Sequence, residues 1–197
     1  MTNVPGIDPY ETGVLNKDVH DMLVKNLSNY CREAGIHPRW VWTPLAETCS
    51  PDVVDYVKMF NVYRAEGKRH GLLFVRGDGM NGKPDEQMAA IAGALMRNFI
   101  KPRFLTLHSV LDALEDGDPI TETCLLIPNF SLSKHEAGGK GDSLPGFKIQ
   151  WLYDLLVKRG NLSLQTMLYA TSKDHMTQEY GAAITDFLHA HYTDAVI

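Results

Sequence analysis

A glycine-rich turn near the middle of the chain restricts the possible folds more than any other stretch. It lies within residues 71–84, after a short apolar run and before a helical pattern. Glycines in such a turn allow successive backbone N–H groups to point at one ligand, and the following helix adds the N–H groups of its first turn. The stretch therefore predicts a buried strand, a loop that can hold a phosphate, and a helix.

The spacing of the glycines and the lysine matches the phosphate-binding pattern G-x-x-x-x-G-K-S/T except at its last position. That position is Pro84, which has neither a hydroxyl to bind Mg²⁺ nor a backbone N–H to bind phosphate. Proline is well tolerated in the first turn of a helix, so the shape of the turn need not change. An ordinary glycine-rich turn of an α/β protein explains the same residues equally well. The candidate nucleotide-binding residues are Gly77, Gly79, Asn81, Gly82 and Lys83.

The length and composition predict one domain with a short tail. The chain has 197 residues, of which 44% are hydrophobic, and this suffices for one full core. Residues 1–15 are rich in proline, glycine and aspartate, so we predict a flexible N-terminal tail before a single domain over 16–197. The first part of that domain, about 16–60, is expected to be a helical extension. No apolar run approaches the ~18 residues of a membrane span, and no signal peptide is recognisable, which predicts a cytoplasmic protein.

The charges, cysteines and histidines exclude several classes of protein. The formal net charge is -5, which argues against a surface devoted to nucleic acid. Basic patches occur at 68–70 and at Arg97, Lys101 and Arg103, and we interpret them as charged residues that flank buried strands. The three cysteines lie far apart and the eight histidines form no cluster with ligand spacing, so neither a disulfide nor a metal site is expected.

The apolar periodicity alternates between strands and helices along the chain. Continuous apolar runs predict four strands, over 71–75, 104–107, 124–127 and 165–170. Helical spacing predicts helices over 16–35, from Ser50 onward, over 88–99, from a cap at Ser109, over 147–159 and over 178–191. Residues 36–42 contain a proline and are expected to run extended. Strands that alternate with helices of this size predict a parallel sheet covered on both faces.

The order of these elements resembles the ATPase domain of bacterial and phage helicase loaders, the DnaC/DnaI type of AAA+ protein. Ala34–Arg39 is similar to the family's G-I-P-x-R segment, and Met88–Leu95 is similar to its A-x-A-I-A-x-x-L helix. Arg159 with Thr166–Ser172 resembles the arginine and the sensor-1 strand, and Tyr180–Ile184 resembles the helix that carries an arginine finger. The resemblance implies an α/β, P-loop NTPase-like fold of the AAA+ type, a three-layer sandwich with a mostly parallel central sheet, here without a C-terminal lid.

The chain departs from this family at the positions that carry the chemistry of hydrolysis. Where the resemblance places two acidic residues at the end of the Walker B strand, the chain has Pro128 and Asn129, which can neither activate water nor hold a metal by charge. Lys173 replaces the sensor-1 asparagine, and Phe187 replaces the arginine finger. Because an arginine finger alone contributes roughly 10³- to 10⁵-fold to the rate, the resemblance implies a scaffold that no longer hydrolyses ATP.

We therefore expect a degenerate helicase-loader-like protein that acts as a non-hydrolysing binding or adaptor subunit. It would serve a DNA replication, recombination or related nucleoprotein machine and would be encoded by a phage or a mobile element. No catalytic residue, metal or cofactor is expected. The partner would be a protein of such a complex, for example a helicase or a related ATPase, whereas direct DNA binding is not favoured and no membrane is involved. A subunit without nucleotide or finger should be a monomer or part of a hetero-complex.

Two other functions stay open. In the first, ATP or ADP binds weakly through Lys83, with Asp85 or Glu86 as displaced metal ligands. In the second, an enzyme of unrelated chemistry uses residues such as His135 or Asp142 of the glycine-rich loop at 135–146, or Lys140 beside them. The sequence has no nucleophile elbow, acid pair or triad spacing that would support the second.

Overall fold

The computed structural model describes residues 17–77, 83–132 and 144–197. Five strands in this part of the chain form one sheet in the order β2-β3-β4-β1-β5, and all neighbouring strands are parallel. The strands are β1 (Gly71–Val75), β2 (Pro102–Phe104), β3 (Cys124–Ser131), β4 (Gln165–Ala170) and β5 (Tyr192–Val196). The predicted α/β class and parallel sheet are confirmed, and β5 lies where no strand is predicted.

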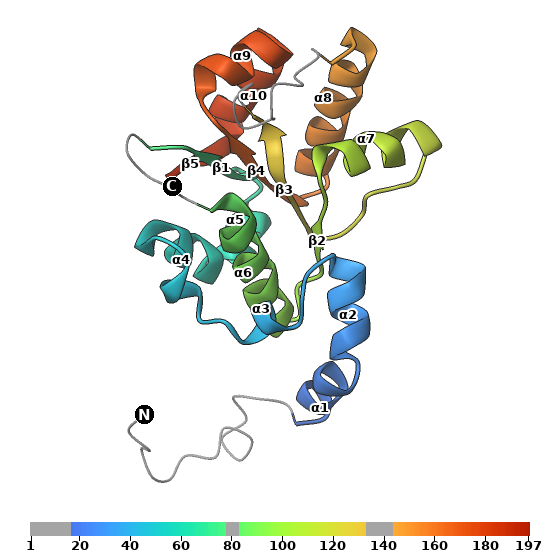
Figure 1. Ribbon diagram of the computed structural model, residues 1–197, viewed down its shortest axis with the longest axis vertical. Coiled ribbons are helices and arrows are strands. Elements are labelled where there is room, and N and C mark those ends of the chain that lie inside the picture. The colour runs from blue at the N-terminus through green and yellow to red at the C-terminus, as the bar shows by residue number, and fades with distance from the viewer. Residues whose placement is uncertain (1–16, 78–82, 133–143) are drawn as a thin grey trace.

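Helices cover both faces of this sheet, which gives the predicted three-layer sandwich (Figure 1). They are α1 (Lys17–Lys25), α2 (Leu27–Ala34), α3 (Arg39–Trp42), α4 (Pro51–Lys58), α5 (Phe60–Glu66), α6 (Pro84–Arg97), α7 (Leu107–Asp116), α8 (Gly146–Asn161), α9 (Lys173–Tyr180) and α10 (Ala182–His191), with a 3-10 turn η1 at Leu45–Glu47. Successive side chains of a strand point to opposite faces, so each central strand contributes to two cores. Leu72 and Phe74 of β1 pack with α2–α6, whereas Leu73 packs with α7–α10.

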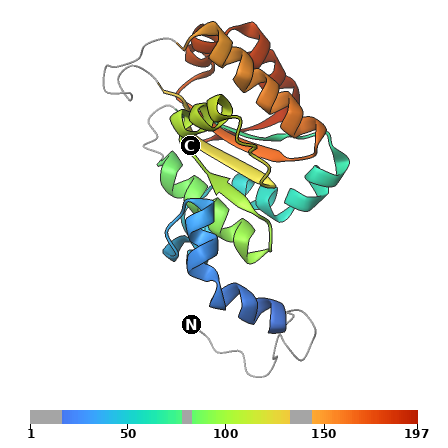
Figure 2. The ribbon, with the colours of Figure 1, turned by 90° about the vertical axis from the view of Figure 1, so that its right-hand side faces the viewer.

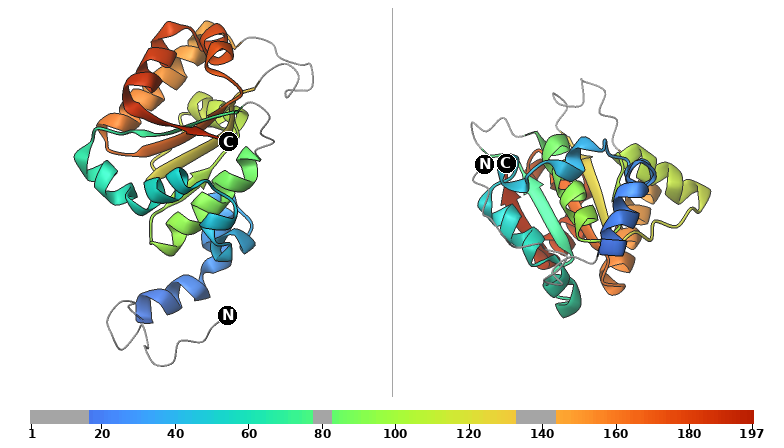
Figure 3. Two further views of the ribbon diagram at one scale, coloured as in Figure 1. Left: turned by 90° about the vertical axis from the view of Figure 1, so that its left-hand side faces the viewer. Right: turned by 90° about the horizontal axis from the view of Figure 1, so that it is seen from below.

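The N-terminal helices differ from the single helix predicted over 16–35. The helix is broken at Asn26, whose side-chain Nδ2 donates to the carbonyl of Met22 (2.9 Å). The backbone N–H of Asn26 donates to the same carbonyl (3.1 Å), so the side chain shares an acceptor with the helical ladder, an arrangement that often bends a helix. Gly35 ends α2 as predicted, in the left-handed region at φ 76°. As a result α1 extends away from the sheet (Figures 2 and 3).

The prediction of an extended segment over 36–42 is wrong, because Arg39–Trp42 form the short helix α3. Pro38 lies at the start of this helix, where its fixed φ is compatible with helical structure, rather than inside it. The helix packs closely on α6: a Cβ atom on Gly93 would lie 2.1 Å from the carbonyl oxygen of Trp40. The guanidinium of Arg97 fixes the same contact by donating to the carbonyl of Val41 (2.6 Å).

Several further boundaries differ from the prediction, among them the strand predicted over 104–107, which is β2 at Pro102–Phe104. The helix predicted over 178–191 is two helices, α9 and α10, separated by Gly181 at φ 78°. The cap of α7 is Thr106, whose hydroxyl accepts the N–H of Ser109 (3.2 Å), and not Ser109 itself. Strand β3 continues through Pro128 to Ser131. Pro128 lies in the gap of the β3–β4 register and beyond the last β2–β3 pair, so its missing N–H costs no ladder bond.

The C-terminus of α6 holds a phenylalanine where glycine is the usual residue. Phe99 has φ 58°, its N–H donates to the carbonyl of Met96, and the N–H of Ile100 donates to the carbonyl of Leu95. This is the Schellman arrangement, in which a left-handed residue ends the helix. The left-handed conformation is costly for any residue with a Cβ atom.

We expect Phe99→Gly to be more stable than Phe99→Ala by about 1 kcal/mol, because both remove the ring but only glycine relieves the backbone strain. Urea unfolding followed by circular dichroism measures the difference. The explanation fails if the alanine variant unfolds at an equal or higher urea concentration.

Candidate nucleotide site

The predicted phosphate loop lies at the carboxyl end of the sheet, between β1 and α6. Gly77 follows β1, and its backbone N–H donates to the carbonyl of Ile197 after β5 (2.9 Å). Lys83 immediately precedes α6, whose first residue is Pro84. Gly79, Asn81 and Gly82 lie outside the described residues. The strand and the helix that flank the loop are confirmed, whereas phosphate binding by its residues stays a prediction.

The ammonium group of Lys83 already has a carboxylate partner. Its Nζ lies 3.0 Å from Oε1 of Glu86, and the Lys83 side chain is 71% exposed. Such an exposed pair contributes little to stability, so Lys83 can leave it at small cost. Glu86, considered above as a displaced metal ligand, is thus occupied by a cation. Burial and the nearby Glu86 raise the pKa of Asp85, as expected for a carboxylate that no cation stabilises.

The end of β3 carries no charge where hydrolysis would require two acids. Pro128 is buried and has no functional group. The side-chain Oδ1 of Asn129 accepts the backbone N–H of Leu107 (2.8 Å), an N–H at the start of α7 that has no helical partner. Asn129 therefore has a structural role: its side chain fixes the first turn of α7 to β3.

Lys173, which the resemblance to helicase loaders places at the sensor-1 position, forms an ion pair within the chain. Lys173 is the first residue of α9, and its Nζ lies 2.5 Å from Oδ2 of Asp194 in the middle of β5. Ser172 caps the same helix by accepting the N–H of His175 (3.1 Å). The positive charge of Lys173 is thus balanced by the carboxylate of Asp194 on the neighbouring strand.

A serine, a histidine and a glutamate meet between the end of β3 and α9. The hydroxyl of buried Ser131 donates to Oε2 of Glu179 (2.7 Å) and lies 3.1 Å from Nδ1 of His175. A catalytic pair would need the serine proton to go to the histidine. Here the carboxylate of Glu179 accepts from the serine, which is not the arrangement of a nucleophile activated by a histidine. The cluster holds α9 against β3, and the i,i+4 spacing of His175 and Glu179 is the one sequence signal that could have revealed it.

Phe187, which the resemblance places at the arginine-finger position, packs against side chains of its own domain. Phe187 of α10 contacts the rings of His70, His191 and Tyr153, with centroid distances of 5.7, 4.8 and 5.9 Å. His70 and His191 also stack on each other at 4.6 Å. Burial and then the neighbouring His191 lower the pKa of His70, which favours the uncharged ring in this aromatic cluster. Phe187 is therefore a packing residue in the described structure.

Neither a metal site nor a membrane helix is found in the described parts of the chain. No group of three or more histidine, cysteine, aspartate or glutamate side chains there could hold a metal ion. Among the helices of residues 17–77, 83–132 and 144–197, none is both long and apolar enough to cross a membrane.

The strand order, with the glycine-rich loop between the interior strand β1 and α6, defines the class of fold: this is an AAA+-type P-loop NTPase fold. No protein-family model matches the sequence, and no curated protein sequence matches it. The fold expected from the resemblance to helicase loaders is confirmed, whereas membership of the loader family stays a prediction.

Solved structures that are similar to the chain include two replication initiation proteins and a helicase loader. A DNA replication initiation factor matches with a TM-score of 0.55 and 10% identity, over 82% of this chain and 50% of the other. The replication initiator DnaA bound to AMPPCP and single-stranded DNA matches with a TM-score of 0.54 and 11% identity, also over 82% and 50%. The DnaC helicase loader has a TM-score of 0.47 and 12% identity, over 71% and 86%. The chain spans about half the length of the two initiators, and at these identities the likeness establishes the fold alone.

Proposed function

We propose that the protein is a non-hydrolysing AAA+-type adaptor subunit in a DNA replication, recombination or related nucleoprotein machine of a phage or mobile element. Its likeness in fold to two replication initiators supports the replication setting. The segments similar to helicase loaders, Ala34–Arg39 and Met88–Leu95, favour a helicase or a related ATPase as its partner. In this proposal the sheet and its helices serve as a scaffold for protein contacts.

The main support for a protein that does not hydrolyse ATP is the end of β3. It has Pro128 and Asn129, and the side chain of Asn129 is bonded to the start of α7. Hydrolysis on this type of fold needs Mg²⁺ held near the phosphates and a residue that orients the attacking water. Neither side chain supplies a charge for the metal or a base for the water. Two further contributions to the rate of ATP hydrolysis, a sensor-1 asparagine and an arginine finger, are also missing. Their positions hold Lys173, paired with Asp194, and Phe187, packed on aromatic rings.

The full-length protein is expected to hydrolyse ATP with Mg²⁺ no faster than buffer alone, in a coupled assay with an active AAA+ ATPase as positive control. Calorimetric titration with ATP and Mg²⁺ should show no saturable binding at micromolar concentration. Lys83→Ala should change neither result. Lys58→Ala is the matched control, because Lys58 is another exposed lysine paired three residues away, with Asp55 at 3.0 Å.

Micromolar ATP binding that Lys83→Ala abolishes and Lys58→Ala preserves would contradict the proposal. It would support the second function considered, a nucleotide-binding loader with Lys83 on the phosphates. His135, Lys140 and Asp142, the candidates for an unrelated enzyme, lie outside the described residues, as does the predicted tail at 1–15.

A further inference from the structure

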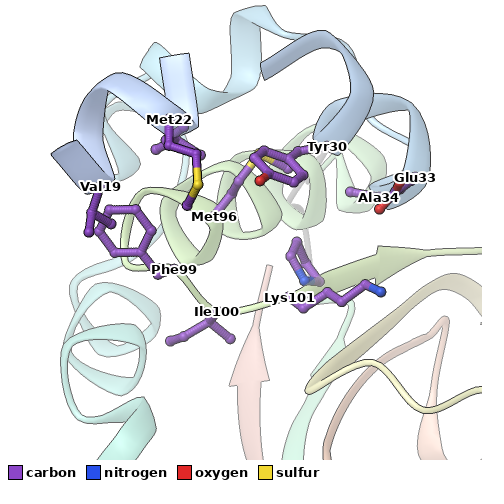
Figure 4. A pocket seen from close by; sticks show the side chains of 11 residues that line it. Val19, Met22, Tyr30, Glu33, Ala34, Met96, Phe99, Ile100 and Lys101 are labelled. Atoms are coloured by element: carbon purple, nitrogen blue, oxygen red, sulfur yellow. The ribbon is translucent and has the colours of Figure 1, made fainter. Parts of the chain in front are cut away.

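An apolar groove lies far from the nucleotide site, between the N-terminal helices and the end of α6 (Figure 4). It has a volume of about 290 Å³. Met22 and Tyr30 from α1 and α2 form one wall, and Met96 and Phe99 form part of the other. Two charged residues line it, Glu33 and Lys101.

Two apolar side chains of this groove are left largely exposed by the described part of the chain. Met22 is 52% exposed and Phe99 is 55% exposed, and Leu23 is the one buried residue of α1. Large exposed apolar side chains that share one hollow commonly mark an interaction site. The left-handed backbone of Phe99 adds to this, because strain kept at an exposed aromatic residue needs a reason other than the stability of the free protein.

The size and chemistry of the groove suit side chains of another protein better than a small molecule. Pockets for cofactors and substrates are usually about 300–1,000 Å³ with several converging polar groups. This groove, at about 290 Å³, lies at the lower limit of that range, and its lining side chains with polar atoms are Tyr30, Glu33 and Lys101. A hollow of this size accepts two or three apolar side chains, as a groove does when it binds one face of an amphipathic helix.

The charge beside the groove indicates the character of such a helix. Between residues 97 and 111 the chain has Arg97, Lys101 and Arg103 but no acidic residue, although its net charge is -5. The hydrogen bonds of Arg97 go to the carbonyls of Val41 and Thr43, and that of Arg103 goes to the carbonyl of Glu33 (2.7 Å). Carbonyl acceptors leave the full positive charge in place. No ion pair within the described residues involves any of the three.

The opposite wall does not offset this charge. Helices α1 and α2 together carry three basic and three acidic residues, so their net charge is zero. The α6–β2 side of the groove therefore carries positive charge: Lys101 lines the groove, and Arg103 donates to the carbonyl of the lining residue Glu33. Opposite charge on a partner increases the rate of association and suppresses wrong partners.

We propose that this groove binds an acidic amphipathic helix presented by a partner protein. Two or three apolar side chains of that helix enter the groove against Met22 and Phe99, and its carboxylates face Lys101 and Arg103. The inference rests on the adaptor function proposed above, since it supplies the surface by which an adaptor holds its partner. Binding at the groove and turnover of ATP are separate measurements, so either can fail while the other holds.

The first test uses two synthetic helical peptides with the same leucines at i, i+3, i+4 and i+7. One carries glutamate and the other lysine on the remaining face, and fluorescence anisotropy measures their binding to the full-length protein. The acidic peptide is expected to bind about tenfold more tightly than the basic one. Phe99→Gly should weaken its binding about tenfold through loss of an aromatic anchor, although this variant keeps the C-terminal turn of α6. Lys101→Glu should remove the preference for the acidic peptide.

Leu162→Ala is the matched control, because Leu162 is 58% exposed just after the end of α8, at the other side of the sheet. It should bind the acidic peptide like the wild type. Failure of the acidic peptide to bind, equal binding of both peptides, or equal loss in the control variant would overturn the proposal.

The second test identifies the occupant in the cells that produce the protein. Benzoylphenylalanine placed at Met22 in the full-length chain is cross-linked by light, and mass spectrometry locates the joined residue. A cross-link to an acidic amphipathic helix of another protein supports the proposal. A cross-link to residues 1–16 of the same chain, to a second copy, to nucleic acid or to a basic segment overturns it.

Discussion

Replacement of Arg159 by methionine is expected to lower the free energy of unfolding by about 3–5 kcal/mol. The Arg159 side chain is 1% exposed. Its Nε donates to the hydroxyl of Thr166 (2.9 Å). Its terminal nitrogens donate to the carbonyls of Ile120, Glu122 and Gln165, at 3.0, 3.0 and 2.7 Å. Methionine fills similar space but removes the donor from four acceptors, two of them buried and two partly buried, and each acceptor left unpaired is costly.

Arg159 also connects three segments that are separate in the sequence. It lies on α8, and its partners lie on β4 and on the segment that enters β3. Burial lowers the pKa of its guanidinium group, which is the expected cost of a charge in the interior. The four hydrogen bonds must offset that cost in the native state, so their loss affects the register of β3 as well as the stability.

Urea unfolding of Arg159→Met, followed by circular dichroism, gives the loss of stability directly. Arg159→Lys should lie between the wild type and methionine, because a single ammonium group cannot reproduce the planar fork of a guanidinium. Lys158→Met changes the exposed neighbour and should stay within about 0.5 kcal/mol of the wild type. A loss below about 1 kcal/mol for Arg159→Met would show that the four bonds are not needed.

The central strands could be predicted because burial on both faces makes them continuous apolar runs. Strand β4 was predictable at its observed bounds, Gln165–Ala170, for this reason. Strand β5 could not be predicted from its pattern: Thr193 and Asp194 interrupt it, and it follows α10 without an intervening turn residue. It is an edge strand, and β1 supplies its ladder partners. Tertiary pairing, rather than local propensity, decides such a strand.

The element boundaries that differ from the prediction share one physical cause. The usual effect of a proline or an asparagine depends on where it lies relative to its hydrogen-bonding neighbours. A proline ends a strand where the ladder needs an N–H at that position, but Pro128 lies in a gap of both ladders. Pro38 interrupts a helix when it lies inside, but here it precedes α3. Asn26 lies between α1 and α2, and its side chain bonds to the carbonyl of Met22, which the apolar spacing does not reveal.

The candidate site was predictable to the extent that it is local. Gly77, Lys83 and Pro84 follow one another along the chain, so spacing alone places them between a strand and a helix. The ion pair of Lys173 with Asp194 and the bond from Leu107 to Asn129 join distant segments. Spacing cannot give those contacts, and they are the ones that bear on whether the site is active.

Replacement of Gly71 by alanine is expected to destabilise the protein by at least about 3 kcal/mol. Gly71 begins β1 and pairs with Thr166 of β4 on one side and Tyr192 of β5 on the other. A Cβ atom there would lie 1.6 Å from the carbonyl oxygen of Thr166 and 2.9 Å from Cε1 of Tyr192. The nearer atom belongs to backbone, so no side-chain rotation can relieve the overlap.

To accommodate the methyl group, β1 must move away from β4, although β1 is the strand that leads into the glycine-rich loop. The movement would weaken the bond from the N–H of Thr166 to the carbonyl of His70 (2.8 Å). Urea unfolding measures the loss, and Gly146→Ala is the control, since a Cβ atom there meets nothing within 4 Å. That variant should change stability by less than about 0.5 kcal/mol. If Gly71→Ala unfolded at the same urea concentration as Gly146→Ala, the close contact of β1 with β4 that positions the loop would be wrong.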